Sequence, residues 1–331
     1  LGATLELSDP LNLHGHTLHK TGAGKLIINS NVPTDGGGTL VVRRGSLLGP
    51  GMVNGTLKAG DATIAPGTGI GTLNVTGNYV QDSKSVLSVE IDSADQHDLL
   101  AIAGAAHFNG ELAIHVNESF NPNPGESFTI ATFASSLGDF DFVSGLNTAN
   151  TTPLAIVSEP TKVRLVAAST DHWIGPSENW MGMDNWLSGH LPSTATIAQL
   201  SNGEDVQITG PVPDVLSINI SKGSLYVKSE GFVNVLADTN VKPTASLHVD
   251  GERTKLITNN LIIEGSFNLT NMGLAEVTNK LTLGSNGTLA VHGNDRAMAQ
   301  TYINLRCFIV HRFISLFEAI GIWFALRSKS S

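Results

Sequence analysis

Five titratable residues within nine positions could carry acid–base or metal chemistry. They lie in the stretch EIDSADQHD and are Glu90, Asp92, Asp95, His97 and Asp98. Paired carboxylates can hold Ca²⁺ or serve as the acid and base of a polysaccharide hydrolase or lyase. An aspartate in a turn also accepts backbone hydrogen bonds, so we expect a turn-forming role for Asp98 and keep catalysis as the alternative.

Three histidines stand close together in the stretch LHGHTLH, at His14, His16 and His19. If this stretch were a strand, the first two would share a face and could ligate zinc or copper together with a carboxylate. No such carboxylate is predictable nearby. We therefore expect exposed histidines and no metal site.

A glycine-rich turn followed by lysine, HKTGAGKLIINS, resembles a phosphate-binding loop. That loop requires G-x-x-x-x-G-K-[ST]. Here His19 occupies the place of the first glycine, and Leu26 follows Lys25 where a hydroxyl is needed. We therefore expect a corner, a strand that leaves it with Lys25 facing water, and no nucleotide or other cofactor.

Residues 169–192, STDHWIGPSENWMGMDNWLSGHLP, contain Trp173, Trp180 and Trp186. Exposed indoles offer flat apolar faces on which sugars can stack, which would make this segment a carbohydrate-binding module. The preferred interpretation is that the indoles cover the open end of a repetitive structure, whose core would otherwise meet water.

Asn-x-Ser/Thr triplets mark glycan sites if the chain passes through a eukaryotic secretory route. A chain rich in Asn, Gly and Thr also generates such triplets by chance. The candidate positions are Asn54, Asn74, Asn117, Asn150, Asn219, Asn268 and Asn286.

The composition restricts the partners. The 331 residues carry a formal net charge of -10 with 15% charged residues, so their surface would repel nucleic acid and anionic membranes. A hydrophobic content of 41% is enough for a buried core. The one cysteine, Cys307, leaves no internal disulfide and no thiolate metal site.

A short motif recurs along the chain and is followed each time by a run of alternating apolar residues. It reads GTL, GEL, GSL, ASL or GSF and begins at Gly38, Gly55, Gly71, Gly110, Gly223, Ala245, Gly265 and Gly287. The steps are 17 and 16, then 39 (about two units), and 22, 20 and 22 in the second half. Alternation of this kind predicts half-buried strands. The spacing favours an all-β solenoid in which strands of successive coils stack at about 4.8 Å.

The first half resembles the autotransporter-associated β-strand repeat of bacterial surface and secreted proteins over residues 18–168. The matching stretches are LHKTGAGKLIINS, GGGTLVVRRGSLLGPG and APGTGIGTLNVTG, followed by VLSVEIDSADQHDLLAIAGAAHFNGELAIHV and PNPGESFTIATFASSLGDFDFV. The resemblance implies a right-handed parallel β-helix outside the cell, adhesive or scaffolding, with no shared catalytic residue. No run after residue 168 supplies that family's translocating barrel, so we expect a fragment or a secreted relative without one.

The chain is predicted to have five parts. They are a solenoid block at 1–115, a non-repetitive β segment at 116–168, the tryptophan-rich junction at 169–192, a second solenoid block at 193–295 and an atypical tail at 296–331. Arg306, Arg312 and Glu318 make a membrane-spanning helix in the tail unfavourable. An interfacial helix or a wrong reading frame are the alternatives, and membrane association is expected only through this tail.

Together these patterns predict an exported structural or adhesin-like protein, extracellular or on the cell surface, without catalytic activity or cofactor. Its expected partner is an extracellular polysaccharide, matrix or cell-surface ligand, and no nucleic acid. The alternatives are a polysaccharide-active lyase or hydrolase and a carbohydrate-binding module.

Overall fold

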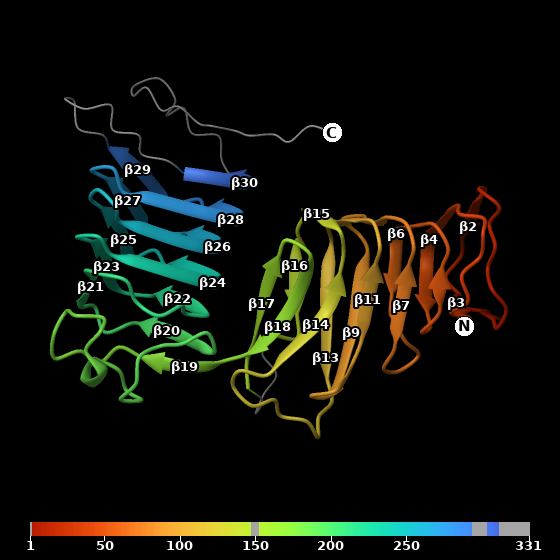
Figure 1. Cartoon of the computed structure of the whole chain (residues 1–331), viewed down its shortest axis with the longest axis horizontal. Helices are drawn as coiled ribbons and strands as arrows, with labels where there is room; N and C mark the ends of the chain where they lie inside the picture. The colour runs from red at the N-terminus through yellow and green to blue at the C-terminus, as the bar shows by residue number, and fades with distance from the viewer. Residues whose placement is uncertain (1, 147–151, 293–302, 311–331) are drawn as a thin grey trace. The chain divides into compact units, whose positions relative to one another are not determined.

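The computed structural model describes residues 2–146, 152–292 and 303–310, with backbone alone for His292 and for 303–310. The chain is 56% strand and 1% helical and forms a parallel β-solenoid of about 13 turns, which confirms the predicted fold class. It divides into two compact units, Leu1–Ala167 and Ala168–Ser331, which are described separately below (Figure 1).

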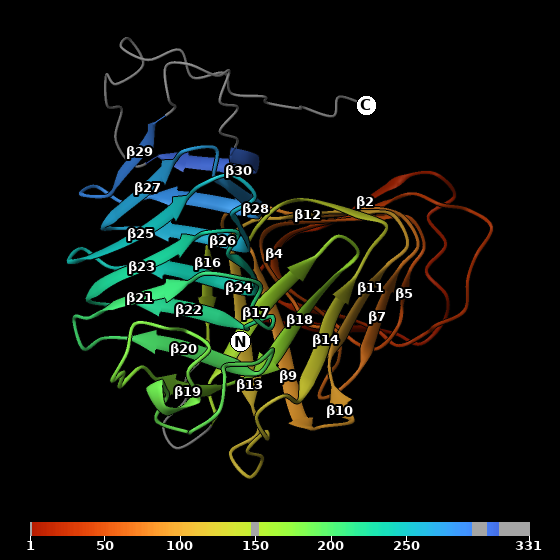
Figure 2. The ribbon, with the colours of Figure 1, turned by 60° about the vertical axis from the view of Figure 1, so that its left-hand side comes forward.

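The first unit has three faces, each made of parallel strands from successive coils (Figure 2). One face contains β2 (Thr17–Lys20), the first halves of β4 (Thr39–Leu48) and β6 (Thr56–Ile64), then β8 (Tyr79–Gln81), β12 (Ala105–Phe108) and β15 (Ser135–Gly138). The second contains β1 (Thr4–Leu7), β3 (Lys25–Ile28), the second halves of β4 and β6, β9 (Val86–Ser93), β13 (Glu111–Val116) and β16 (Phe142–Ser144). The third contains β5 (Met52–Val53), β7 (Thr72–Val75), β11 (Leu99–Ile102) and β14 (Ser127–Thr132).

Antiparallel pairing occurs at the end of this unit. β17 (Leu154–Glu159) and β18 (Lys162–Ala167) form a hairpin, and β18 runs antiparallel to β14. The short β10 (Gln96–His97) also folds back antiparallel on β9. The repetitive coil therefore gives way to a different β arrangement in this region.

The described strands of the second unit pair in parallel and lie in successive rows in Figure 1, and an isolated antiparallel bridge joins Trp173 to Trp186. One sheet contains β19 (Ser169–His172), β20 (Thr196–Leu200), β22 (Ser217–Ile220), β24 (Phe232–Val241), β26 (Lys255–Ile263), β28 (Leu274–Leu283) and β30 (Ile303–Val310). The other contains β21 (Asp205–Ile208), β23 (Gly223–Lys228), β25 (Ala245–Asp250), β27 (Ser266–Thr270) and β29 (Thr288–His292). A 3₁₀ turn, η1 (Met183–Asn185), precedes β20.

Inward side chains form columns because residues of the same parity face the interior on every coil. Along the ten residues of β24, every second side chain is buried. One buried column of the first unit consists of Leu40, Leu57, Tyr79 and Ala106. One of the second unit consists of Leu225, Leu247 and Phe267. Each unit has its own apolar core.

The recurring motif lies at the start of a strand in both units, but every step between motifs equals one coil only in the second unit. There Gly223 pairs with Ala245, and the strands that follow Gly265 and Gly287 continue the same stack. In the first unit the strands after Gly38 and Gly55 stack directly. The motif at Gly71 begins a strand of another face, where Thr72 pairs with Leu99. The 39-residue step to Gly110 therefore does not represent two coils.

The tail prediction lies mostly outside the described residues. Within it, β30 pairs in parallel with β28, so residues 303–310 are a strand and the interfacial-helix alternative is wrong for them. In the part of the chain that the structure describes, no helix has the length and hydropathy to cross a membrane.

Candidate functional site

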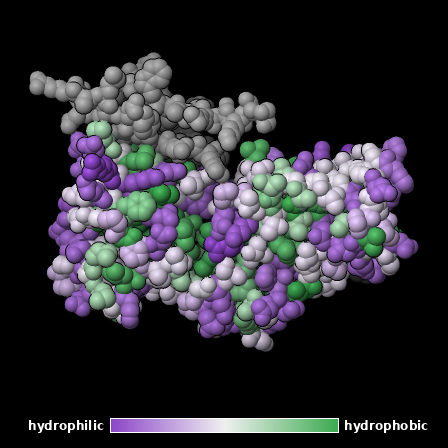
Figure 3. Space-filling model, viewed as in Figure 1, coloured by the Kyte–Doolittle hydropathy of each residue, from purple (hydrophilic) through white to green (hydrophobic). Residues whose placement is uncertain are grey.

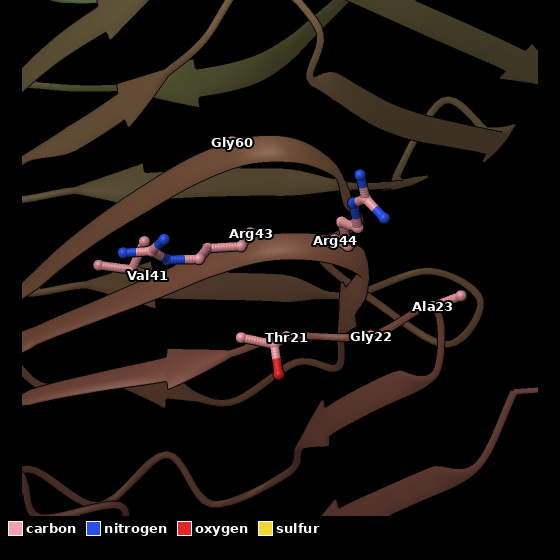
Figure 4. A pocket seen from close by; sticks show the side chains of 7 residues that line it. All are labelled: Thr21, Gly22, Ala23, Val41, Arg43, Arg44 and Gly60. Carbon is pink, nitrogen blue, oxygen red and sulfur yellow. The ribbon is translucent and has the colours of Figure 1, made fainter.

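A groove of about 670 Å³ opens on the outside of the first unit (Figure 4). Three successive coils form it. The first contributes the corner after β2, the second contributes β4 and the third contributes β6. The lining residues are Thr21, Gly22, Ala23, Val41, Arg43, Arg44 and Gly60.

Arg43 and Arg44 are adjacent in sequence and yet both exposed, because β4 bends between two faces at this point. In a straight strand, neighbouring side chains point to opposite sides of the sheet. At the corner this alternation is interrupted, and Gly45 with φ +76° makes the bend. Arg43 extends along its strand toward Val41, whereas Arg44 projects from the other end of the corner (Figure 4).

Lys20 joins this corner to the preceding coil through hydrogen bonds. Its Nζ donates hydrogen bonds to the carbonyl oxygens of Gly22, at 2.9 Å, and Arg44, at 2.6 Å. A Cβ at Gly45 would lie 2.6 Å from this Nζ and 2.3 Å from the Gly24 oxygen. Glycine is therefore required at position 45, and the backbone that carries the two arginines is held in place.

Further basic groups lie beside the groove. His19, Val41 and Lys58 occupy neighbouring positions on three coils, and His19 and Lys58 are exposed. Arg43 Nε donates to His19 Nδ1 at 3.2 Å. We call the residues His19, Lys20, Arg43, Arg44 and Lys58 the basic strip. Arg44 Nε lies 3.9 Å from Asp61 Oδ2. Both side chains are more than 60% exposed, so this ion pair contributes little to stability.

Sequence reasoning missed this site. The stretch GTLVVRRGSLL was interpreted as one alternating strand, in which adjacent arginines would not act together. Two consecutive charged residues before a glycine were the available signal, because they mark a corner where alternation stops.

In the acidic stretch, the structure buries Asp98 and leaves Glu90, Asp92 and Asp95 exposed. Asp98 is 1% exposed, and its two carboxylate oxygens accept the backbone N–H groups of Gly71 at 2.8 Å and Glu90 at 3.0 Å. Burial raises the pKa of Asp98 to about 6, although both hydrogen bonds lower it; the charges of Glu90 and Asp92 add to the increase. The Asp98 carboxylate thus links Gly71 of the preceding coil to Glu90 in β9, through hydrogen bonds to residues 27 and 8 positions away from it in sequence.

The other members of the acidic stretch lie at or near the surface, and Glu90 and Asp92 alternate with buried residues on β9 and therefore share its outward side. Glu90, Asp92 and Asp95 are exposed, and Asp92 accepts a hydrogen bond from Asn117 at 3.1 Å. The His97 ring packs edge-on against Phe128 at 5.7 Å. Burial lowers the pKa of His97, and its backbone contact with Thr129 and the charge of Asp95 act in the opposite direction.

The three N-terminal histidines do not share a strand. His14 lies in a turn with φ +47°, and β2 begins only at Thr17, after His16. Among the described residues, no group of three or more His, Cys, Asp or Glu side chains is placed to hold a metal ion.

The three tryptophans of the junction at residues 169–192 are packed together and buried. Trp173, Trp180 and Trp186 are 2%, 1% and 1% exposed. The Trp186 ring meets those of Trp173 and Trp180 edge-on at 5.1 and 4.8 Å, and its Nε1 donates to the Trp180 carbonyl at 3.0 Å. The cluster packs on the core of the second unit next to its first strands. Buried rings offer no face to a sugar, and this arrangement fits a cover over the first coil of that unit.

Lys25 is exposed at the start of β3 and follows a corner, as predicted for the glycine-rich stretch.

Among the candidate glycan sites, Asn54 is 3% exposed and accepts a hydrogen bond from the Thr34 N–H, so its side chain cannot carry a glycan in the folded chain. Asn150 lies outside the described residues. Exposed or half-buried positions are Asn74, Asn117, Asn219, Asn268 and Asn286.

No known family model matches this chain, and no curated protein matches it. The likeness to the autotransporter repeat therefore depends on the motifs quoted above alone, and the solenoid itself is consistent with a β-helix repeat protein. On the face seen in Figure 3, hydrophobic and hydrophilic residues are interspersed on both units.

The raised pKa of Asp98 predicts a pH-dependent stability. Because its folded pKa of about 6 exceeds the unfolded value near 3.8, the folded state binds the proton more tightly. This contribution is greatest below pH 4 and is lost as the pH rises to 6, by about 2–3 kcal/mol. Urea unfolding followed by circular dichroism should show the stability of the wild type falling relative to that of Asp98→Asn by this amount as the pH rises from about 4 to about 6. A constant difference would contradict the assignment.

The cover formed by the tryptophans can be tested by truncation. We expect Trp180→Ala to destabilise the second unit by about 3–5 kcal/mol, because it opens a large cavity in a packed cluster. Leu187→Ala, in the same segment but with Leu187 64% exposed, should change stability by less than about 0.5 kcal/mol. Denaturant titration monitored by tryptophan fluorescence measures both, and equal effects would show that the indoles do not support the fold.

Proposed function

We propose that this chain is an exported, autotransporter-like β-solenoid that presents its outward faces to an extracellular ligand and catalyses no reaction. Its role is structural or adhesive, outside the cell or at the cell surface. Support comes from the parallel solenoid, from the motif resemblance over residues 18–168, and from the hydrogen bonds of Asp98 to the backbone, which give this carboxylate a structural role.

The observation that carries the proposal is the regularity of the outward faces. On the second unit, Tyr226 and His248 stack on neighbouring strands at 4.4 Å with an interplanar angle of 12°. Ser246 Oγ donates to Ser224 Oγ at 2.9 Å in the adjacent column. Hydroxyl groups repeat on four strands, at Ser224, Ser246, Ser266 and Thr288, at the spacing between strands of about 4.8 Å, whereas the rings stack on two strands. Such an array fits an extended ligand that lies across several coils.

The polysaccharide-active enzyme is the second candidate, and one observation favours it. Asp98, with its pKa raised to about 6, lies near the exposed Glu90 and Asp92, and enzymes use carboxyl groups tuned in this way as general acids. Against it, Asp98 is buried and both of its oxygens already accept backbone hydrogen bonds. A sugar-binding module based on the tryptophans is not pursued, because the rings are buried.

A turnover assay separates the two candidates. Purified chain incubated with pectin, alginate or chitin is expected to release no new reducing or unsaturated ends, because Asp98, the carboxyl group with the raised pKa, is buried and both of its oxygens already accept backbone hydrogen bonds. The same preparation with Asp92→Ala serves as the matched control. Turnover by the wild type that the Asp92→Ala variant lacks would establish the enzyme and overturn our proposal.

The exported location is tested on intact cells of the source organism. We expect an antibody against the second unit to label unpermeabilised cells or the culture medium, because a displayed solenoid must be accessible from outside. Labelling that requires permeabilisation would contradict the proposed location without affecting the fold.

A further inference from the structure

We propose that the groove on the first unit binds the anionic groups of a linear acidic polysaccharide, with Arg43 and Arg44 as the main donors. This inference rests on the proposed function, because it names the ligand class for one of the displayed faces. The recognised chemistry is an oxyanion, either carboxylate or sulfate, repeated along an extended polymer.

The guanidinium groups of Arg43 and Arg44 both have N–H donors that can bind a ligand. Within the described residues, Arg43 uses its Nε on His19, and its terminal N–H groups are left for a ligand. The Arg44 guanidinium contacts, among the residues that the structure describes, only the exposed Asp61, at 3.9 Å. Guanidinium forks match the geometry of carboxylate and sulfate oxygens, and charge-assisted hydrogen bonds of this kind are stronger than neutral ones.

The groove is open at a place where the fold would allow a side chain. Gly60 lies beside Arg43 on the next coil, and a Cβ there would meet no atom closer than 3.5 Å. Its φ is outside the left-handed region, so neither the backbone nor the packing requires glycine. The missing side chain leaves room along the two arginines for a ligand.

The lining favours a polysaccharide over a nucleic acid. Apart from the arginines, it consists of small and aliphatic residues, namely Thr21, Gly22, Ala23, Val41 and Gly60. Proteins that bind single strands stack the bases on aromatic side chains, and this groove contains none. A sugar chain needs only donors for its acidic groups and an open track.

The charge distribution directs a polyanion to these coils. Residues 1–60 contain five Lys and Arg against three Asp and Glu, whereas residues 61–167 contain three against twelve. The basic strip therefore lies at the least acidic part of the first unit. An acidic polymer is attracted there and repelled by later coils, and its affinity should fall with added salt.

Binding of defined polymers to immobilised full-length chain tests the proposal. The probes are polygalacturonate for carboxylates, dextran sulfate for sulfates, neutral dextran as the uncharged control, and single-stranded oligothymidine as the nucleic-acid control. We expect at least one acidic polysaccharide to bind. Neutral dextran should not bind, and oligothymidine should bind with lower affinity than the acidic polysaccharide. The stronger of the two acidic probes identifies the anionic group.

Charge variants locate the site. Arg43→Gln combined with Arg44→Gln should weaken binding at least tenfold, whereas Arg253→Gln, an exposed arginine of the second unit, should change it less than twofold. Asp61→Asn removes the competing carboxylate and should strengthen binding severalfold. Thermal melts confirm that each variant is folded.

A steric and charge block gives an independent readout. Gly60→Glu should reduce binding as strongly as the double arginine variant. Gly210→Glu is the matched control, because Gly210 lies on the second unit and a Cβ there, like one at Gly60, would make no contact closer than 3.5 Å.

Other binding results would contradict the site, the ligand class or the proposed function. Unchanged affinity in the double arginine variant, or no binding of either acidic polysaccharide, refutes the groove as the site. Stronger binding of oligothymidine refutes the ligand class. Depolymerisation of polygalacturonate would instead refute the proposed non-catalytic function, and would leave the groove as a binding site if the variants still reduced affinity.

Discussion

The stacking of one coil on the next is the interaction on which this chain depends. A single coil contributes only a few inward aliphatic side chains, too few to offset the conformational entropy lost on folding. Leu57 is fully buried because Leu40 and Tyr79 lie directly beside it on neighbouring coils. The register of the backbone ladders therefore determines the core, since a slip of one residue would turn inward side chains to water.

Corners impose the second constraint, because inward polar groups gather there and must find partners. In the second unit, Asn260 Nδ2 donates to Asp238 at 2.8 Å, and Asn279 Nδ2 donates to Asn260 at 2.9 Å. The fully buried Thr239 and Thr258 hydroxyls bond to each other at 2.9 Å beside this ladder. Asp98 performs a comparable task in the first unit with its two backbone contacts. Hydrogen bonds that run from coil to coil thus support the register set by the apolar columns.

The sequence predicted strands and interior well because alternation is a local property that each segment displays by itself. The fold class and the exposed Lys25 followed from such local patterns. Assignment of strands to faces was less successful. The motif at Gly71 looks like those at Gly38 and Gly55, but pairing between distant coils places its strand on another face. The groove was missed for the same reason, since Thr21, Arg43 and Gly60 come together only through inter-coil register.

Coil length explains why specific chemistry is expected at corners. In the second unit, corresponding residues Leu225, Leu247 and Phe267 follow at steps of 22 and 20, so its coils are nearly uniform. In the first unit, the steps from Leu40 to Leu57, Tyr79, Ala106 and Ser136 grow from 17 to 22, 27 and 30. The additional residues must enter corners and loops, because ladder register fixes the strands. A solenoid can therefore lengthen its corners and loops without disturbing its core. Arg43 and Arg44 lie within β4 in the shortest of these steps, so this corner presents its charges without additional residues.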